Sequence, residues 1–277
     1  MSKFFLHLTM PRFASDRLKW IYTMTKYILF YLLLSSPSCL AAQNVDTTIR
    51  KVYIGFAYST DIFPESWRPE PISGSGHPIE RGEIQRSKTI IAKALSKYPD
   101  IIFEDNLKAV YFLKDMKFFD VAYGGTNSPS AVYLTNQGVA SGYTDKYLEQ
   151  TFHHEFSSIL FRNHPSFLDT NAWKGANAFN FTYNDPENGV GAIRNNQSSQ
   201  ELDSVLCLKG VLTQYGGSSI ENDVNTFAQN LFCPEKNFWN YVDRFPRIKQ
   251  KANLLINFYS RISAVYTEQY FRKMDKL

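Results

Sequence analysis

The sequence predicts an α+β protein in which short strands come first and helices follow. The segments 51–58 and 130–135 are rich in β-branched and aromatic residues, a composition typical of strands. From residue 145 onward, apolar residues recur every three or four positions, as they do along the buried face of a helix. Strands in the first half and helices in the second half together indicate the α+β class.

The first 42 residues show the order of a secretory signal. Lys26 precedes an eight-residue apolar run, Tyr27–Leu34, and a Ser/Pro break and small residues that end in Ala41-Ala42 follow it. The run is too short to span a bilayer. We therefore expect cleavage after Ala41 or Ala42, export to the periplasm or the cell surface, and a mature domain of residues 43–277 without a transmembrane helix.

Two features of this segment leave alternatives open. Met24 stands just before the basic residue, so we expect translation to start there, which would make residues 1–23 an upstream extension. Cys39 follows Ser36-Pro37-Ser38 instead of the aliphatic residue that usually precedes a lipoprotein cysteine. A lipid anchor is therefore the less favoured alternative, and a retained membrane anchor is less favoured still.

The charge balance argues against nucleic acid as a partner. The whole chain carries 30 basic and 26 acidic side chains, but residues 1–42 hold five of the basic ones and one of the acidic ones. The mature chain is therefore neutral, and it contains no Lys/Arg run. Because nucleic-acid binding requires a basic patch, we do not expect it.

Cys207 and Cys233 are the two cysteines of the mature region. A disulfide can persist in an exported protein, and both residues fall in helices that we expect to be neighbours. We predict that they are bridged. Two buried free thiols are the alternative.

The predicted elements follow in chain order. The first half begins with a strand at 51–58, a loop at 64–78 and a helix at 83–98. Short strands follow at 101–103, 110–113 and 118–123, and after them come a turn at 124–127 and a strand at 130–135. In the second half we expect an aromatic-rich loop or strand at 173–183, a turn at 215–219, and helices at 145–163, 201–214, 219–232 and from 246 onward. Thr144 and Ser219 are expected to cap two of these helices, and Pro246 to open the last.

The helix at 145–163 has an apolar face and a polar face. Its core-facing arc consists of Leu148, Phe152, Phe156, Ile159 and Leu160. His154, Glu155 and Ser158 fall on the opposite arc and are expected to point into a common space. His153 turns away from that space, so we expect it to be a supporting or core residue.

The segment His154-Glu155-Phe156-Ser157-Ser158 is a variant of the H-E-x-x-H motif. In that motif, two histidines four residues apart bind zinc, and the glutamate activates the bound water. Ser158 occupies the place of the second histidine. His164 would lie roughly 15 Å from His154 along an unbroken helix, so we expect a histidine at the helix end and not the missing ligand.

These segments resemble the gluzincin metallopeptidases, and more narrowly the zinc-binding metallopeptidases found among exported bacterial proteins. Those proteins carry a T-x-H-H-E-F-x-H-I-L helix, which Thr151–Leu160 matches except at Ser158. They also carry a later helix that opens with a glutamate ligand, which Glu221 matches. The resemblance covers about residues 100–270.

The resemblance implies a zincin-like fold, with a small mixed sheet, an edge strand beside the active-site helix and a mostly helical C-terminal half. The strand Ala131–Thr135 is then expected at the sheet edge beside a cleft, where an extended substrate would pair with it. An ordinary strand with a covered edge is the alternative.

The resemblance also implies a role for each site residue. His154 and Glu221 would bind zinc, and Glu155 would act as the general base on the bound water. Tyr215 would donate its hydroxyl to the developing oxyanion. The structural alternatives are a buried polar pair for His154 and Glu155, an acid favoured by a helix N-terminus for Glu221, and a packed aromatic residue for Tyr215.

Ser158 leaves two function hypotheses open. A serine hydroxyl is a poor zinc ligand, and His154 and Glu221 supply two ligands where catalytic sites use three. In the first hypothesis the chain is an exported zinc-dependent metallopeptidase with an atypical metal site, which hydrolyses a peptide or protein substrate through a metal-activated water. In the second it is a catalytically inactive zincin-fold module that has a binding or structural role in the cell envelope.

Overall fold

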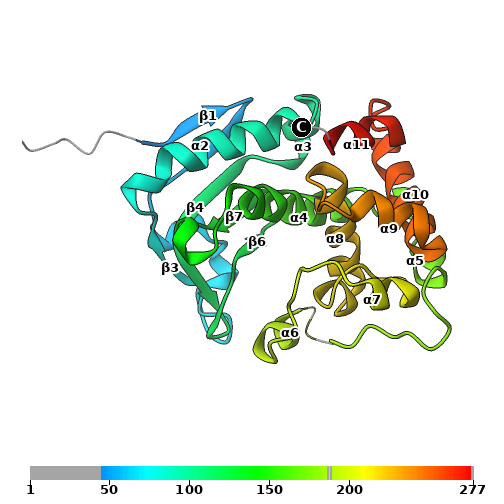
Figure 1. The fold of residues 1–277 in the computed structure, drawn as a ribbon. Helices are drawn as coiled ribbons and strands as arrows, with labels where there is room; N and C mark the ends of the chain where they lie inside the picture. The colour runs from blue at the N-terminus through cyan, green and yellow to red at the C-terminus, as the bar shows by residue number, and fades with distance from the viewer. Residues whose placement is uncertain (1–44, 186, 188, 276–277) are drawn as a thin grey trace, which may run out of the picture. The chain divides into compact units, whose positions relative to one another are not determined.

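The computed structural model describes residues 45–275 except 186 and 188 (Figure 1). These residues belong to one unit, Val45–Leu277. The predicted signal, with its cleavage site, Met24 and Cys39, lies outside the described residues. Within the described residues, no helix is long and apolar enough to cross a membrane.

The strands of the described chain form a seven-stranded mixed sheet with the order β1-β2-β4-β7-β6, and β3 and β5 both pair with β4. The strands β2, β4 and β7 run parallel, whereas β1 and β6 flank them as antiparallel neighbours. The strand bounds are β1 (Thr47–Ile49), β2 (Val52–Gly55), β3 (Ser75–Pro78), β4 (Ala109–Phe118), β5 (Val121–Ala122), β6 (Gly125–Asn127) and β7 (Ala131–Thr135).

The central strands β4 and β7 are buried on both faces of the sheet. Successive side chains point to opposite faces, so alternate residues enter different cores. The larger core, shared with the helices, takes Val110, Phe112, Val132 and Leu134. A smaller cluster on the other face contains Ala109, Leu113, Ala131, Tyr133, Phe63 and Met116. Double-sided burial explains why residues 109–113 of β4 and 131–134 of β7 are apolar without interruption.

The helices occupy most of the second half, in the green-to-red part of the chain in Figure 1. This agrees with the predicted order of strands before helices. The helix α4 packs against α8, α2, β6 and β7 and so lies at the centre of the fold. The helix bounds are α2 (Arg81–Ser96), α3 (Ile101–Asn106), α4 (Asp145–Asn163), α5 (Thr170–Gly175), α6 (Val190–Arg194), α7 (Ser204–Lys209), α8 (Ile220–Phe232), α9 (Phe238–Arg244), α10 (Pro246–Ile262) and α11 (Glu268–Met274).

Several helix ends confirm the local signals in the sequence. Thr144 caps α4 by accepting a hydrogen bond from the backbone N–H of Tyr147. Ser219 caps α8 in the same way, and Pro246 opens α10. These ends follow from side-chain capping and from the fixed φ of proline, which act within a few residues.

Several predicted elements are wrong. The predicted loop at 64–78 contains the strand β3, and the predicted strand at 118–123 consists of the end of β4, a turn and β5. The segment 101–103 is part of the helix α3 and not a strand, because short apolar runs do not distinguish the two structures. The predicted turn at 124–127 contains the strand β6. The predicted helix at 201–214 is limited to α7, because Gly210 ends it in a left-handed conformation with φ 100°.

The predicted edge position of Ala131–Thr135 is also wrong. This strand, β7, pairs with β4 on one side and with β6 on the other, and all five of its residues are buried. A strand that is buried throughout belongs inside a sheet. Among the described strands, β6 takes the edge position beside β7.

The predicted disulfide is not formed, since Cys207 and Cys233 are both free and buried. The two thiols have different surroundings. Cys207 lies in α7, which packs against α10, whereas Cys233 follows the end of α8, where the charges of Glu149 and Lys97 reach it. Burial raises the pKa of Cys207 to about 12 and that of Cys233 to about 11, so both thiols stay protonated.

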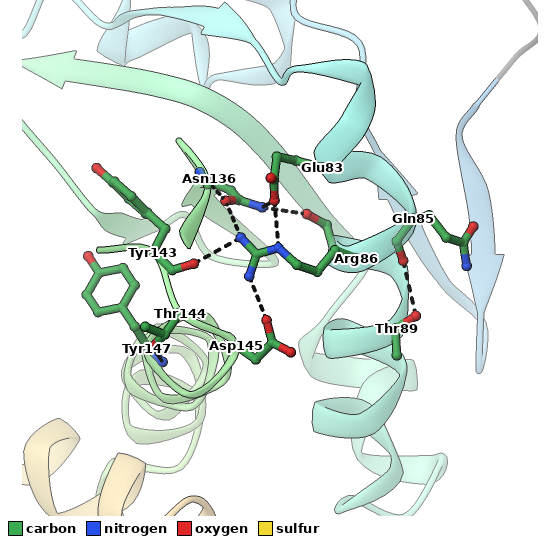
Figure 2. A network of polar contacts seen from close by, with 11 residues as sticks. Glu83, Gln85, Arg86, Thr89, Asn136, Tyr143, Thr144, Asp145 and Tyr147 are labelled. Atoms are coloured by element: carbon green, nitrogen blue, oxygen red, sulfur yellow. Dashed lines mark hydrogen bonds and ion pairs between the residues drawn. The ribbon is translucent and has the colours of Figure 1, made fainter. Parts of the chain in front are cut away.

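Arg86 of α2 fixes the N-terminus of α4 (Figure 2). Its guanidinium donates hydrogen bonds to Asp145 in the first turn of α4 at 2.6 Å and to the carbonyl of Tyr143 at 2.9 Å. It also donates to Asn136, directly after β7, at 2.8 Å and to Glu83 at 2.6 Å. One planar donor group thus ties α4 to α2 and to the end of the sheet, and this contact orients the helix that carries His154.

Candidate functional site

A pocket of about 460 Å³ lies between α4, α8 and β6. All five residues singled out from the sequence line it, namely His154, Glu155, Ser158, Tyr215 and Glu221. They come from three parts of the chain that are brought together when α4 packs against α8. The structure therefore places the predicted site residues in one cavity.

His154 is buried on the pocket side of α4 between amide side chains. Its Nδ1 lies 2.8 Å from Oε1 of Gln229, and the ring of Tyr215 stacks on the imidazole with 5.9 Å between centroids. Burial lowers the pKa of His154, while contacts with Gln229, Glu221 and Asn222 oppose this shift. The imidazole is thus favoured in its neutral form and held in one orientation.

Glu155 lies at the junction of α4 and β6. Its Oε2 accepts a 2.6 Å hydrogen bond from Nδ2 of Asn127 in β6. Burial raises the pKa of Glu155 to about 7, although the bond from Asn127 and the charge of Arg162 oppose this effect. A carboxyl group with this pKa can exchange a proton near neutral pH.

Gly125 permits the close approach of β6 to α4. A Cβ at this position would lie 2.4 Å from Cγ2 of Thr151 and 2.9 Å from Oε1 of Glu155. Any side chain here would push the strand away from the helix. The glycine therefore keeps the sheet edge against the pocket.

Ser158 joins α4 to α8 through its hydroxyl group. The hydroxyl donates to Oε1 of Glu221 at 2.7 Å and accepts from Nδ2 of Asn225 at 2.6 Å. The Ser158 side chain is buried. Since a hydroxyl has one proton to donate, that proton is used on Glu221.

Arg162 lies one helical turn after Ser158 and also borders the pocket. Its Nη1 is 3.5 Å from Oε1 of Glu221. Its Nη2 donates to Oδ1 of Asn127 and, at 3.2 Å, to the carbonyl of Ser128. The guanidinium therefore connects α4, α8 and the sheet edge.

Tyr215 lies beside His154, just before α8. Burial raises the pKa of its phenol well above the ordinary value, and the carboxylates of Glu155 and Glu221 act in the same direction. The hydroxyl group is therefore protonated at physiological pH and available as a hydrogen-bond donor.

His153 faces away from the pocket, as predicted. Its Nδ1 lies 2.8 Å from the hydroxyl of Tyr98, and its ring stacks on Phe232 with 5.0 Å between centroids. It is fully buried among the aromatic side chains of Tyr98, Phe152 and Phe232. Its role is thus in packing.

The pocket residues do not fit a resident zinc ion. The place of the second histidine is taken by Ser158, which donates its proton to Glu221, and Glu221 is also paired with Arg162. Among the residues that the structure describes, no group of three or more histidine, cysteine, aspartate or glutamate side chains could hold a metal ion.

Four residues that line the pocket beside the predicted ones were not predicted from the sequence, namely Asn127, Arg162, Asn225 and Gln229. Three of them carry a signal in their spacing. Asn225 and Gln229 follow Glu221 by one and two helical turns, and Arg162 follows Ser158 by one turn. Asn127 carries no such signal, because its segment resembles a turn.

Comparison with known proteins supports the fold. No model of a known protein family matches the chain, and no curated protein matches it significantly. Among solved structures, a protein from Bacteroides caccae described as a "putative zinc-binding metallo-peptidase" is similar. The similarity has a TM-score of 0.51, 16% sequence identity, and coverage of 80% of this chain and 84% of that chain. At this identity the likeness shows a shared fold and nothing more.

Proposed function

We propose that this chain is an exported, catalytically inactive member of the zincin-like metallopeptidase fold that binds an extended peptide segment along β6. The observation that carries the proposal is the position of β6. It is an edge strand that borders a pocket whose residues do not fit the zinc site that the fold resemblance implies.

The register of β6 directs the backbone groups of two of its residues away from its one paired strand, β7. The backbone N–H of Thr135 donates to the carbonyl of Gly124, and the N–H of Ser128 donates to that of Ala131. In an antiparallel pair, every second residue directs its backbone groups at the partner strand. The backbone groups of Gly125 and Asn127 therefore point away from β7, where an added strand can pair with them.

The side chains around the pocket suit a peptide backbone. Many lining residues carry neutral amides, including Gln150, Gln200, Asn222, Asn225 and Gln229. Amide groups both donate and accept hydrogen bonds, as a peptide backbone does. Tyr215 adds a protonated hydroxyl near His154.

A zinc-dependent peptidase with an altered site is the second candidate function. It is favoured by the meeting of His154, Glu155 and Glu221 in one pocket. It requires Glu221 to exchange its contacts with Ser158 and Arg162 for a metal ion, and it also requires a third ligand.

A permanently unfolded protein serves as the probe that separates the two candidates. Reduced, carboxymethylated and fluorescently labelled lactalbumin is mixed with the purified protein, with added zinc or with a chelator. We expect the fluorescence anisotropy to rise equally in both conditions, and mass spectrometry to find the probe intact. Zinc-dependent fragments would favour the peptidase, and an unchanged anisotropy would refute peptide binding.

Gly125→Ala provides a test within the chain itself. The added methyl group meets Thr151 and Glu155 and should displace the sheet edge, so we expect probe binding to weaken by about tenfold or more. Gly175→Ala is the matched control, because a Cβ at residue 175 meets no atom within 4 Å. Equal binding by the two variants would show that β6 is not the binding edge.

A further inference from the structure

Arg162 carries the permanent positive charge of the pocket. Among the described lining residues, no other arginine or lysine is present. The acidic side chains of Glu155 and Glu221 line the same cavity as this guanidinium. A guanidinium beside two acidic side chains offsets the repulsion between their negative charges.

The contacts of Arg162 reach both carboxylates. Its Nη1 is paired with Oε1 of Glu221 at 3.5 Å. Its Nη2 donates to Oδ1 of Asn127, and Nδ2 of the same amide donates to Glu155 at 2.6 Å. Asn127 thus relays the orientation of the guanidinium to Glu155.

Arg162 and Ser158 hold the same oxygen of Glu221. The Ser158 hydroxyl donates to this Oε1 at 2.7 Å, and Asn225 completes the contact by donating to Ser158. A metal ion that used Glu221 would have to replace a hydroxyl proton and compete with a guanidinium. The hydrogen bond and the ion pair both hold the Glu221 carboxylate in its present position, and the guanidinium repels a second cation beside it.

We propose that Arg162 is the resident cation of this pocket and takes the electrostatic place of the metal ion. It holds Glu221 on Ser158, holds Glu155 through Asn127, and thereby excludes zinc even when a second histidine is supplied. The inference rests on the proposed function, which requires a pocket without a metal ion, and it names the residue that holds the acidic side chains of that pocket in place. It makes Arg162 a positioning residue.

Zinc affinity in a set of variants tests this inference. Competition with a chromogenic chelator is measured for the parent, Ser158→His, Arg162→Met and the double variant Ser158→His/Arg162→Met. Ser158→His restores the second histidine at helical spacing, yet we expect it alone to gain less than about tenfold in affinity. The double variant should bind zinc about 10–100-fold more tightly than Ser158→His, the range over which contacts to ligands tune metal sites.

Two controls separate the charge of Arg162 from its packing. In the Ser158→His background, Arg162→Lys keeps the positive charge and should keep zinc affinity near that of Ser158→His. Arg261→Met removes a positive charge outside the lining of this pocket and should also leave the affinity unchanged. Arg162→Gln replaces Arg162→Met if the latter does not fold, as judged by near-ultraviolet circular dichroism.

The zinc affinities of these variants decide whether Arg162 excludes zinc. Equal zinc affinity of Ser158→His and Ser158→His/Arg162→Met would overturn the proposal, as would a gain with Arg162→Lys as large as that with Arg162→Met. Binding of the unfolded probe is measured separately on the parent. If the parent does not bind the probe but Arg162→Met still raises the zinc affinity of Ser158→His, peptide binding is refuted and the role of Arg162 stands.

Discussion

Replacing Lys251 by methionine is expected to lower the free energy of unfolding by about 3–5 kcal/mol. Lys251 and Asp223 are both fully buried, and Nζ of Lys251 donates to Oδ2 of Asp223 at 2.5 Å. Burial raises the pKa of Asp223 and lowers that of Lys251, and the attraction between the two charges opposes both shifts. Methionine would leave the carboxylate in the core without its cation.

The effect would reach the candidate site through α8. Asp223 lies on that helix two residues after Glu221, and it also accepts hydrogen bonds from Trp173 and Tyr183. The ion pair thus locks α8 against α10 and α5. Its loss should loosen the wall of the pocket that carries Glu221.

Urea unfolding followed by circular dichroism measures this loss. The double variant Asp223→Asn/Lys251→Met should recover much of the stability, because no charge remains buried. Lys51→Met is the matched control, because Lys51 pairs with Glu104 at the exposed surface and its replacement should leave the free energy of unfolding nearly unchanged. A Lys251→Met variant as stable as this control would contradict the argument.

Glu149→Gln should be similarly destabilising at neutral pH, by about 3–5 kcal/mol, and the loss should shrink on acidification. Glu149 is buried between α4 and α2, where it is paired with Lys97 and, at 3.1 Å, with Lys93. Lys97 is itself buried and donates to the carbonyl of Phe232 at 2.6 Å. Glutamine would leave this ammonium without its countercharge.

The pH dependence follows from the direction of the pKa shift. Burial alone would raise the pKa of Glu149, but contacts with His153 and Lys97 outweigh it and hold the pKa well below its usual range. Because burial lowers the pKa of His153 to about 4, the lysines are the cations that act on Glu149 at neutral pH. As the pH falls, the Glu149 side chain is protonated in the unfolded chain before it is protonated in the folded protein, because its pKa is lower when folded. The stability that the Glu149 carboxylate contributes is therefore present above about pH 4.5 and is lost as the pH falls below this value.

The difference in unfolding free energy between parent and Glu149→Gln therefore has to be measured at pH 7 and near pH 3. We expect a large difference at pH 7 and a smaller one in acid. Glu104→Gln, which changes an exposed pair, controls for general acid effects. A difference that does not change with pH would show that Glu149 is not stabilised as a carboxylate.

The local features of the fold could be predicted from the sequence. Thr144, the apolar arc of α4 and Pro165 fix the bounds of that helix through interactions a few residues long, and the structure confirms them. The same periodicity placed His154, Glu155 and Ser158 on one face. Glu221 joins them because Ser219 caps α8 and sets the start of that helix.

The tertiary features could not be predicted in this way. Gly125-Thr126-Asn127 forms a strand only because β7 pairs with it, and its composition is that of a turn. The disulfide failed as a prediction because helix positions do not give the distance between two thiols. The role of Arg162 depends on Asn127 and Glu221, which lie 35 and 59 residues away along the chain.

The zinc content of the purified protein tests the central claim most directly. The protein is saturated with zinc, passed over a gel-filtration column to remove unbound metal, and analysed by inductively coupled plasma mass spectrometry. Because Ser158, Glu221 and Arg162 satisfy one another, we expect far less than one zinc ion per chain. One retained zinc ion per chain, released only by a strong chelator, would contradict a metal-free pocket and restore the peptidase as the better function.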